Sequence, residues 1–377
     1  MVLIGYTHLV QDISTPGIDR RTVKRPSIKD VAREAGCSVS TVSLVVNQRG
    51  NVSDETRERV MKVVRDLSYH ATRSARGLAS KTSGNIGFIL RDDHFSQAEP
   101  FYTRVFLGAE FAARDHNFYV LLATVSHRFS DKKELPRFLL ERNVDGIIIA
   151  GKVSQRFIDQ AEGFGIPIVL VDFEVPRKRY ASILIDNKSG ARAAMEHLIA
   201  SGHKDIAFIG GDIDHPSLAD RLQGYRDTLA DHGITVQDRL IDIREPDTRI
   251  PNGASAMSRL LHERPHLTAV FAANDAMAIG CIQTLREHGI SIPGGVAVVG
   301  FDDVEMSSLM HPRLTTVRVF KEELGNQAVN TLVDMIRNGE NIVVTKHLPV
   351  ELIVRESSST PVRTNSAGAA PDPVTRS

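Results

Sequence analysis

Residues 262–266 read His-Glu-Arg-Pro-His and match the His-Glu-x-x-His pattern, in which two histidines bind zinc and the glutamate activates a water. That chemistry needs both histidines one turn apart on a continuous helix. Pro265 has no amide hydrogen to donate and disfavours helical backbone at the preceding residue, Arg264. The segment therefore predicts a helix that ends here in a surface turn, rather than a zinc site.

Other patterns that support catalysis are missing from the sequence. There is no Gly-x-x-x-x-Gly-Lys-Ser/Thr phosphate loop and no Gly-x-Ser-x-Gly nucleophile elbow. The two cysteines, Cys37 and Cys281, are too few for a structural zinc site or a disulfide framework. We expect a protein that is not an enzyme and that uses no metal or cofactor.

Charge is the remaining source of chemistry. The 377 residues carry 46 Lys+Arg and 46 Asp+Glu, a net charge of zero that alone gives no sign of a nucleic-acid partner. The balance is uneven, because residues 1–83 hold 14 basic and 8 acidic side chains (+6), and the rest hold 32 and 38 (−6). Clustered basic side chains bind phosphates, so the first 83 residues are the candidate nucleic-acid-binding part.

The elements that position these basic residues are three short helices. Ser27 can cap the first, with Asp30 at its third position, and Gly36 ends it. Ser38 can cap a second helix and Ser53 a third, which runs to about residue 67. Two helices joined by a tight turn with glycine are typical of a helix-turn-helix. The alternative is a three-helix domain whose charges merely solvate its surface.

The chain after residue 84 alternates short apolar runs with helical stretches. Continuous apolar strands of this kind favour a parallel sheet covered on both faces, as in doubly wound α/β folds. The expected strands are 86–90, 119–123, 146–149, 168–171, 206–209, 269–272 and 296–299. Residues 1–23 are expected to be a flexible arm and 358–377 a disordered tail. No run of 18 apolar residues and no signal peptide is present, which favours the cytoplasm.

Residues 27–60 resemble the start of the lactose repressor (LacI/GalR) family. The match comprises the run from Ser27 to Asn47 and the segment Val52-Ser-Asp-Glu-Thr-Arg-Glu-Arg-Val60. It continues into the body at 144–148, 186–190, 197–206, 273–278 and 314–317, and so covers about residues 27–356. The resemblance implies a helix-turn-helix head (24–71), a hinge helix (72–83) and an effector-binding and dimerisation domain (84–357). That domain would be two doubly wound lobes, like those of periplasmic binding proteins, with three chain crossings between them.

In such proteins the second helix enters the major groove and reads base edges. Here this implies DNA contacts by Val39, Ser40, Thr41, Ser43, Leu44 and Asn47. Leu44 departs from the family, which commonly has an arginine there that grips guanine. Val39 and Leu44 offer apolar contact to thymine methyls; alternatively, they pack against the third helix or the hinge.

Ala75, Arg76 and Leu78 fall on the family's hinge helix, which in relatives enters the minor groove of the operator. Leu78 would be the side chain wedged into the central base step, which kinks the duplex. The alternative is an ordinary linker with a chance leucine.

The resemblance also implies effector contacts by Phe101, Tyr102, Asp172, Arg221 and Asp275. Carboxylates and arginine orient the hydroxyls of a sugar through charge-assisted hydrogen bonds. The alternatives are that Asp275 caps a helix, that Arg221 pairs with Asp220 and that Phe101 is core.

Together these features predict a homodimeric DNA-binding transcriptional regulator, most simply a repressor. Its partners would be a palindromic operator and a small molecule bound between the lobes. A sugar or sugar derivative is the first candidate, and a purine or another metabolite acting as corepressor is the alternative. A ligand-binding protein without a DNA function is the competing class, but it leaves the basic head unexplained.

Overall fold

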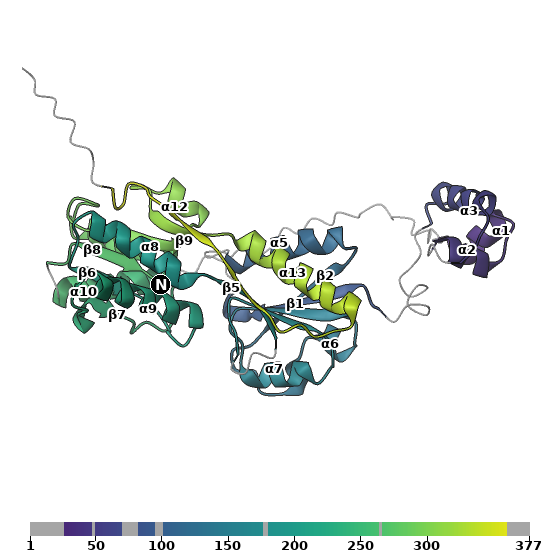
Figure 1. Cartoon of the computed structure of the whole chain (residues 1–377), viewed down its shortest axis with the longest axis horizontal. Coiled ribbons are helices and arrows are strands. Elements are labelled where there is room, and N and C mark those ends of the chain that lie inside the picture. Colours follow the sequence, from purple (N-terminus) through teal and green to yellow (C-terminus); the bar gives the residue numbers. More distant parts are fainter. Residues whose placement is uncertain are drawn as a thin grey trace, which may run out of the picture. The chain divides into compact units, whose positions relative to one another are not determined.

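The computed structural model describes residues 26–46, 50–69, 82–94, 101–175, 180–263 and 266–359. The chain forms two units, residues 1–81 and residues 82–377 (Figure 1). The predicted arm (1–23), Asn47, Ala75, Arg76 and Leu78 lie outside the described residues. None of the helices in the described ranges is long and apolar enough to cross a membrane.

The first unit contains the three predicted helices, α1 (Ile28–Glu34), α2 (Val39–Val46) and α3 (Asp54–Asp66). Ser27 and Asp30 form the expected capping box on α1, and Gly36 follows the helix with a φ of +60°. The three helices share a small apolar core, in which Val31, Val42 and Val60 are buried. These caps and this apolar stripe explain why a segment this short folds as three helices.

The second unit contains two six-stranded sheets, each the centre of one lobe. The sheet of lobe 1 has the order β11-β5-β4-β3-β1-β2 and is entirely parallel. Its strands are β1 (Asn85–Arg91), β2 (Tyr119–Val125), β3 (Gly146–Ala150), β4 (Ile168–Val171), β5 (Ala181–Ile185) and β11 (Thr345–Leu348). Apolar side chains of α5 (Phe101–Asp115) and α13 (Lys321–Asn338) cover one face, and those of α6 (Arg137–Leu140) and α7 (Gln155–Glu162) cover the other.

Lobe 2 repeats this plan with the order β12-β10-β9-β8-β6-β7, in which only β12 is antiparallel among the described strands. Its strands are β6 (Ile206–Ile209), β7 (Ile241–Asp242), β8 (Ala269–Ala272), β9 (Ala297–Asp302), β10 (Thr315–Val319) and β12 (Val350–Ile353). Helices α8 (Asn187–Ala200) and α9 (Pro216–Asp231) pack on one face, and α10 (Ile250–Glu263) and α11 (Asp275–Glu287) on the other. The short α12 (Glu305–Leu309) follows β9. The prediction of two doubly wound lobes is confirmed.

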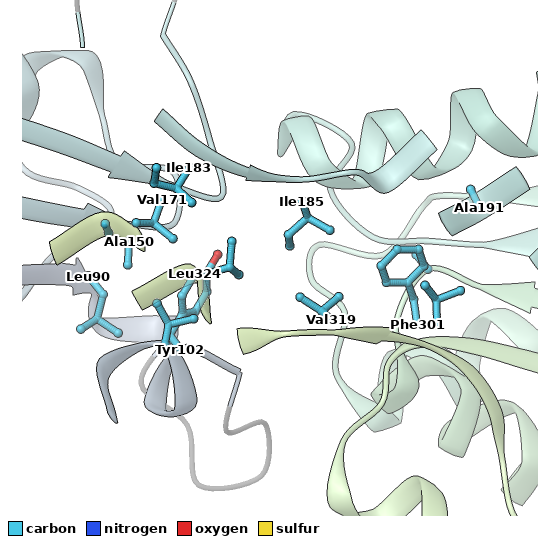
Figure 2. Close-up of a cluster of buried hydrophobic side chains, with 14 of the residues drawn as sticks. Leu90, Tyr102, Ala150, Val171, Ile183, Ile185, Ala191, Phe301, Val319 and Leu324 are labelled. Carbon is cyan, nitrogen blue, oxygen red and sulfur yellow. The ribbon is translucent and has the colours of Figure 1, made fainter. Parts of the chain in front are cut away.

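The chain passes between the lobes three times, as expected. It leaves lobe 1 between β5 and α8, returns between β10 and α13, and leaves again between β11 and β12. In Figure 2, Ile185 and Val319, the last residues of β5 and β10, lie where the first two of these segments begin, between Leu324 in lobe 1 and Phe301 in lobe 2. One buried apolar cluster therefore runs through the connection and joins the two sheets.

Two glycines let helices α5 and α13 approach each other closely. A Cβ atom on Gly108 would lie 1.9 Å from the backbone oxygen of Glu322, and one on Gly325 would lie 2.0 Å from that of Val105. Neither distance is compatible with a side chain, so the crossing of the two helices requires both glycines.

The predicted C-terminal boundary is wrong at Ser358. Ser357 and Ser358 are buried, and the Ser358 hydroxyl donates to Thr315 Oγ1 at 2.7 Å. The Ser357 amide donates to the Arg313 carbonyl, and the Ser357 carbonyl accepts from the Val298 amide. The fold of lobe 2 therefore extends at least to Ser359, because polar residues fill this site by hydrogen bonding instead of apolar packing.

Candidate DNA-binding surface and effector cleft

Helix α2 presents the residues predicted to read DNA. Val39 and Leu44 are 41% and 40% exposed, and Ser40 is also exposed, whereas Val42 and Val45 of the same helix are buried. Thr41 and Ser43 are half-buried, and Ser38 Oγ accepts a hydrogen bond from the Thr41 amide at 3.0 Å. The outer face of α2 therefore combines two exposed aliphatic side chains with small hydroxyls, and it carries no charge of its own.

The second unit contains a cavity of about 400 Å³ between its two lobes. Its walls come from the segments that follow β1, β3 and β4 in lobe 1 and β6, β7, β8 and β9 in lobe 2. The carboxyl ends of parallel strands are where doubly wound folds bind ligands. Four of the five predicted effector residues line this cavity, namely Phe101, Tyr102, Asp172 and Arg221.

Asp172 lies directly after β4 with a φ of +65°, an uncommon conformation for a residue other than glycine. Both of its carboxylate oxygens already accept a hydrogen bond. The Tyr102 hydroxyl donates to one at 2.8 Å, and the Ser217 hydroxyl of lobe 2 donates to the other at 2.6 Å. Burial and the neighbouring Asp172 carboxylate raise the pKa of Tyr102, which keeps the phenol protonated as a donor.

Arg221, in the second turn of α9, is almost fully buried and held on several sides. Its Nε donates to Asn187 Oδ1 at 2.8 Å and its Nη1 to the Ala273 carbonyl at 2.6 Å. The guanidinium lies 3.7 Å from the ring centroid of Phe301, and Nη2 is 3.2 Å from Asp302 Oδ1. The expected alternative, pairing with Asp220, does not occur among these contacts, since Asp220 pairs with Lys188.

Asp302, the last residue of β9, is a cavity residue that sequence reasoning missed. It is 8% exposed, and its Oδ1 has no hydrogen-bond partner despite the nearby Arg221. Burial raises the pKa of this carboxyl, and the charges of Arg221 and Lys321 oppose that rise. The Lys321 ammonium donates to the Asp302 carbonyl and so holds this backbone, whose φ of 107° is unfavourable for aspartate. The result is a buried acceptor directed at the cavity.

Asp275 does not line the cavity, so its position gives no support to the predicted effector contact. It is fully buried at the start of α11, where one oxygen accepts from the Val304 amide at 2.9 Å and the Ser307 hydroxyl at 2.6 Å. The other accepts from the Thr316 hydroxyl. Burial raises the pKa of Asp275 to about 7, with the Asp302 charge acting in the same direction. Its neighbour Asn274 lines the cavity instead and caps α11 through Oδ1, which leaves its amide nitrogen as a donor.

Residues 246–250, which follow β7, form a further wall of the cavity. The guanidinium of Arg259 on α10 holds this segment, because it contacts both oxygens of buried Asp242 at 2.9 Å and Glu245 Oε1 at 2.6 Å. Burial of Asp242 opposes ionisation, but hydrogen bonds from Arg259 and Arg244 outweigh it and lower its pKa to about 2. Arg259 thus positions cavity residues that it does not contact itself.

Helix α10 spans Ile250–Glu263, and His266 lies in a turn, so the two histidines of the His-Glu-x-x-His match do not share this helix. No group of three or more potential metal-ligating side chains is found within the described ranges.

Two family profiles match the chain. One, described as "Bacterial regulatory proteins, lacI family", matches residues 27–72, and the other, "Periplasmic binding protein-like domain", matches residues 195–358. The regulator GalR of Escherichia coli K12 is 33% identical over 340 residues, 89% of this chain and 96% of the relative. Catabolite control protein A of Priestia megaterium is 31% identical over 334 residues, 88% of this chain and 99% of the relative.

Solved structures agree with these matches. The Lac repressor dimer bound to operator and the anti-inducer ONPF has a TM-score of 0.76 at 30% identity, covering 89% of this chain and all of that one. The complex of the regulator CelR with cellobiose has a TM-score of 0.68 at 31% identity, with the same coverage.

Proposed function

Because the chain belongs to the LacI family of bacterial DNA-binding transcriptional regulators, we propose that it is a homodimeric repressor whose operator affinity is set by a sugar bound between its lobes. The cavity carries the effector part of this proposal. A buried carboxylate, a buried guanidinium and an amide donor, from Asp302, Arg221 and Asn274, converge on one wall. Adjacent hydroxyls of a sugar supply matching donors and acceptors.

The wall of lobe 1 supports the same ligand class. Phe101 is half-buried at the start of α5 and lines the cavity beside Tyr102. An aromatic face suits the apolar C–H face of a pyranose ring. Because lobe 1 and lobe 2 residues both line the cavity, a bound sugar changes the free energy of one lobe orientation relative to another. A difference of about 1–3 kcal/mol between DNA-competent and incompetent states changes operator affinity roughly 5–150-fold.

The effector proposal is tested with Arg221→Ala, with Gln223→Ala on the exposed side of the same helix as control. Operator binding is followed by mobility shift, with and without a sugar that releases the unmodified protein. Arg221→Ala should retain operator binding but lose the response, and Gln223→Ala should retain both. Equal loss of operator binding and response in Arg221→Ala would assign this arginine a purely structural role.

For the DNA-binding part, we propose that Val39, Ser40, Thr41, Ser43, Leu44 and Asn47 contact the major groove. The exposed aliphatic tips of Val39 and Leu44 suit thymine methyls and provide no donor for guanine. Leu44→Arg should therefore shift base preference toward guanine at one position of each half-site, by about 1–3 kcal/mol. Met61→Arg on α3 adds the same charge to the head and should leave base preference unchanged. Selection of bound sequences from a random library measures both, and unchanged preference in Leu44→Arg contradicts the assignment.

The hinge contacts of Ala75, Arg76 and Leu78 with the minor groove remain part of the proposal, which places the regulator in the cytoplasm with its DNA. Leu78→Ala should reduce operator bending while sparing non-specific binding, because only the wedge unstacks a base step. Circularly permuted operator fragments measure the bend, and an unchanged bend removes Leu78 from this role.

A further inference from the structure

The described walls of the cavity carry more acidic than basic side chains. Among the residues that the structure describes, four basic side chains line the cavity, Arg91, Lys152, Arg221 and Arg249, and six carboxylates do so, Asp93, Asp172, Asp212, Asp214, Asp247 and Asp302.

Each basic side chain already has a partner within the protein. Arg91 contacts both oxygens of Asp93 through Nε and Nη2. Arg221 is 3.2 Å from Asp302, and Arg249 is 3.3 Å from Asp247.

Lys152 is engaged across the cavity. It extends from lobe 1 to lobe 2, where its ammonium donates to the Asp214 carbonyl at 2.6 Å. His215 adds no positive charge near neutral pH, because burial lowers the pKa of its imidazole.

Three carboxylates are in surplus. Asp172, Asp212 and Asp214 have no lysine or arginine ion pair within the part of the chain that the structure describes. Asp172 receives only neutral hydroxyl donors, from Tyr102 and Ser217. Lys152 offsets one of these charges, because its own partner is an uncharged carbonyl, so the described lining keeps an excess of negative charge that a phosphate or carboxylate on a ligand would meet.

The buried acceptor at Asp302 adds a second, independent requirement. Its Oδ1 is paired with the Arg221 guanidinium at 3.2 Å but accepts no hydrogen bond of good geometry, so this buried acceptor still gains from a ligand donor. A hydroxyl or ammonium group supplies that donor, whereas an ionised phosphate or carboxylate group placed against Asp302 has only acceptors to offer at neutral pH.

We propose that the cleft selects against negatively charged ligands, so that the effector is a neutral or amino sugar and not a sugar phosphate or sugar acid. This inference rests on the proposed sugar response and specifies its ligand class. The discriminating groups are the carboxylates of Asp172, Asp212, Asp214 and Asp302. An anionic derivative should bind about tenfold or more weakly than its neutral parent, because like charges a few ångströms apart repel strongly inside a protein cleft.

The test is calorimetric titration of the full chain at pH 8 and constant ionic strength. The probes are matched sets for glucose, galactose and mannose, each comprising the neutral sugar, its 2-amino derivative, its uronate and its 6-phosphate. The neutral or amino member of at least one set should bind, and its uronate and 6-phosphate should bind about tenfold or more weakly. An anionic member that binds as tightly as its parent overturns the inference and leaves the sugar response intact. Absence of binding by every member overturns the proposed response for these three hexoses, and the inference falls with it for them.

A variant separates charge from shape. Asp212 and Asp214 are exposed at the rim, so the double substitution Asp212→Asn with Asp214→Asn removes two charges without opening the core. The double variant should reduce the difference in affinity between neutral and anionic members several-fold. Added salt should reduce the same difference in the unmodified protein. The exposed Asp238, which does not line the cavity, provides the control variant Asp238→Asn. An unchanged difference in the double variant overturns the assignment of discrimination to these carboxylates.

Discussion

Replacement of the buried Asp275 by asparagine tests whether the carboxyl of this residue binds a proton more tightly in the folded protein than in the unfolded chain. The carboxyl of Asp275 accepts three hydrogen bonds and lies against Gly300, where a Cβ atom would come within 2.3 Å of Oδ1. Asparagine preserves the shape. Its oxygen can accept from the Val304 amide and the Ser307 hydroxyl, and its amide can donate to the Thr316 hydroxyl oxygen.

The expected effect depends on pH, because burial raises the pKa of Asp275 from 3.8 to about 7. Between these values the folded protein keeps a proton that the unfolded chain has released, so the free energy of unfolding falls as pH rises toward 7. The two pKa values give a loss of about 2–3 kcal/mol between pH 5 and pH 8. Asp275→Asn cannot titrate and should lack this loss. Its stability relative to the unmodified protein should therefore rise by that amount across the range.

Urea unfolding at pH 5, 6, 7 and 8 measures the difference, with exposed Asp159→Asn as the control for a general charge effect. Calorimetry with a sugar that binds the unmodified protein adds a second readout, which should change less than twofold because the carboxyl does not line the cavity. If the free energies of variant and unmodified protein change in parallel from pH 5 to pH 8, the pKa of Asp275 is not raised. If stability is kept but sugar binding is lost, Asp275 contacts the effector after all.

Two further predictions concern residues that hold parts of the second unit in position. Arg259→Ala should weaken sugar binding and lower the free energy of unfolding by about 1–3 kcal/mol, because it releases the segment held through buried Asp242. Calorimetric titration and urea unfolding measure the two effects, and the exposed Arg239→Ala should show neither. If Arg259→Ala keeps full sugar affinity, residues 246–250 keep their position without Arg259. Gly108→Ala should lower the free energy of unfolding by at least about 1–3 kcal/mol, because it forces α5 away from α13. Thermal unfolding measures this effect, and Arg114→Ala on the exposed side of α5 should change it little.

The sequence predicts best those elements whose signal is local. Strands β4, β6 and β8 occupy the expected residues because each is a continuous apolar run with buried faces on both sides. Strand β11, with the sequence Thr-Lys-His-Leu, was not predicted, because its place is set by pairing with residues 182–185, far earlier in the chain. Strand β12 has the same origin, since its antiparallel partner is β10. Pairings across such distances leave no periodicity for a local pattern to detect.

The effector residues show a similar limit. Asp275 and Asp302 each lie at the carboxyl end of an apolar run, so their positions in the sequence make them equally good candidates for a ligand contact. Only strand register and helix start decide which carboxyl turns toward the cavity, because neighbouring side chains on a strand point to opposite faces. A sequence signal for Asp302 was present, since it follows the apolar run that begins at Val296. Asn274 carried the signal of a helix cap, which says nothing about the cavity.

The three crossings between the lobes set an order of events during protein synthesis. Lobe 1 has most of its strands once Ile185 has been made, but its edge strand and the helix that packs on α5 come from residues 321–348. The ribosome must add about 160 residues between Ile185 and Leu348, which takes roughly 10–30 s at ordinary translation rates. During that interval the face of lobe 1 that α13 later covers stays without that helix, so lobe 1 can complete its fold only after residues 321–348 have been made.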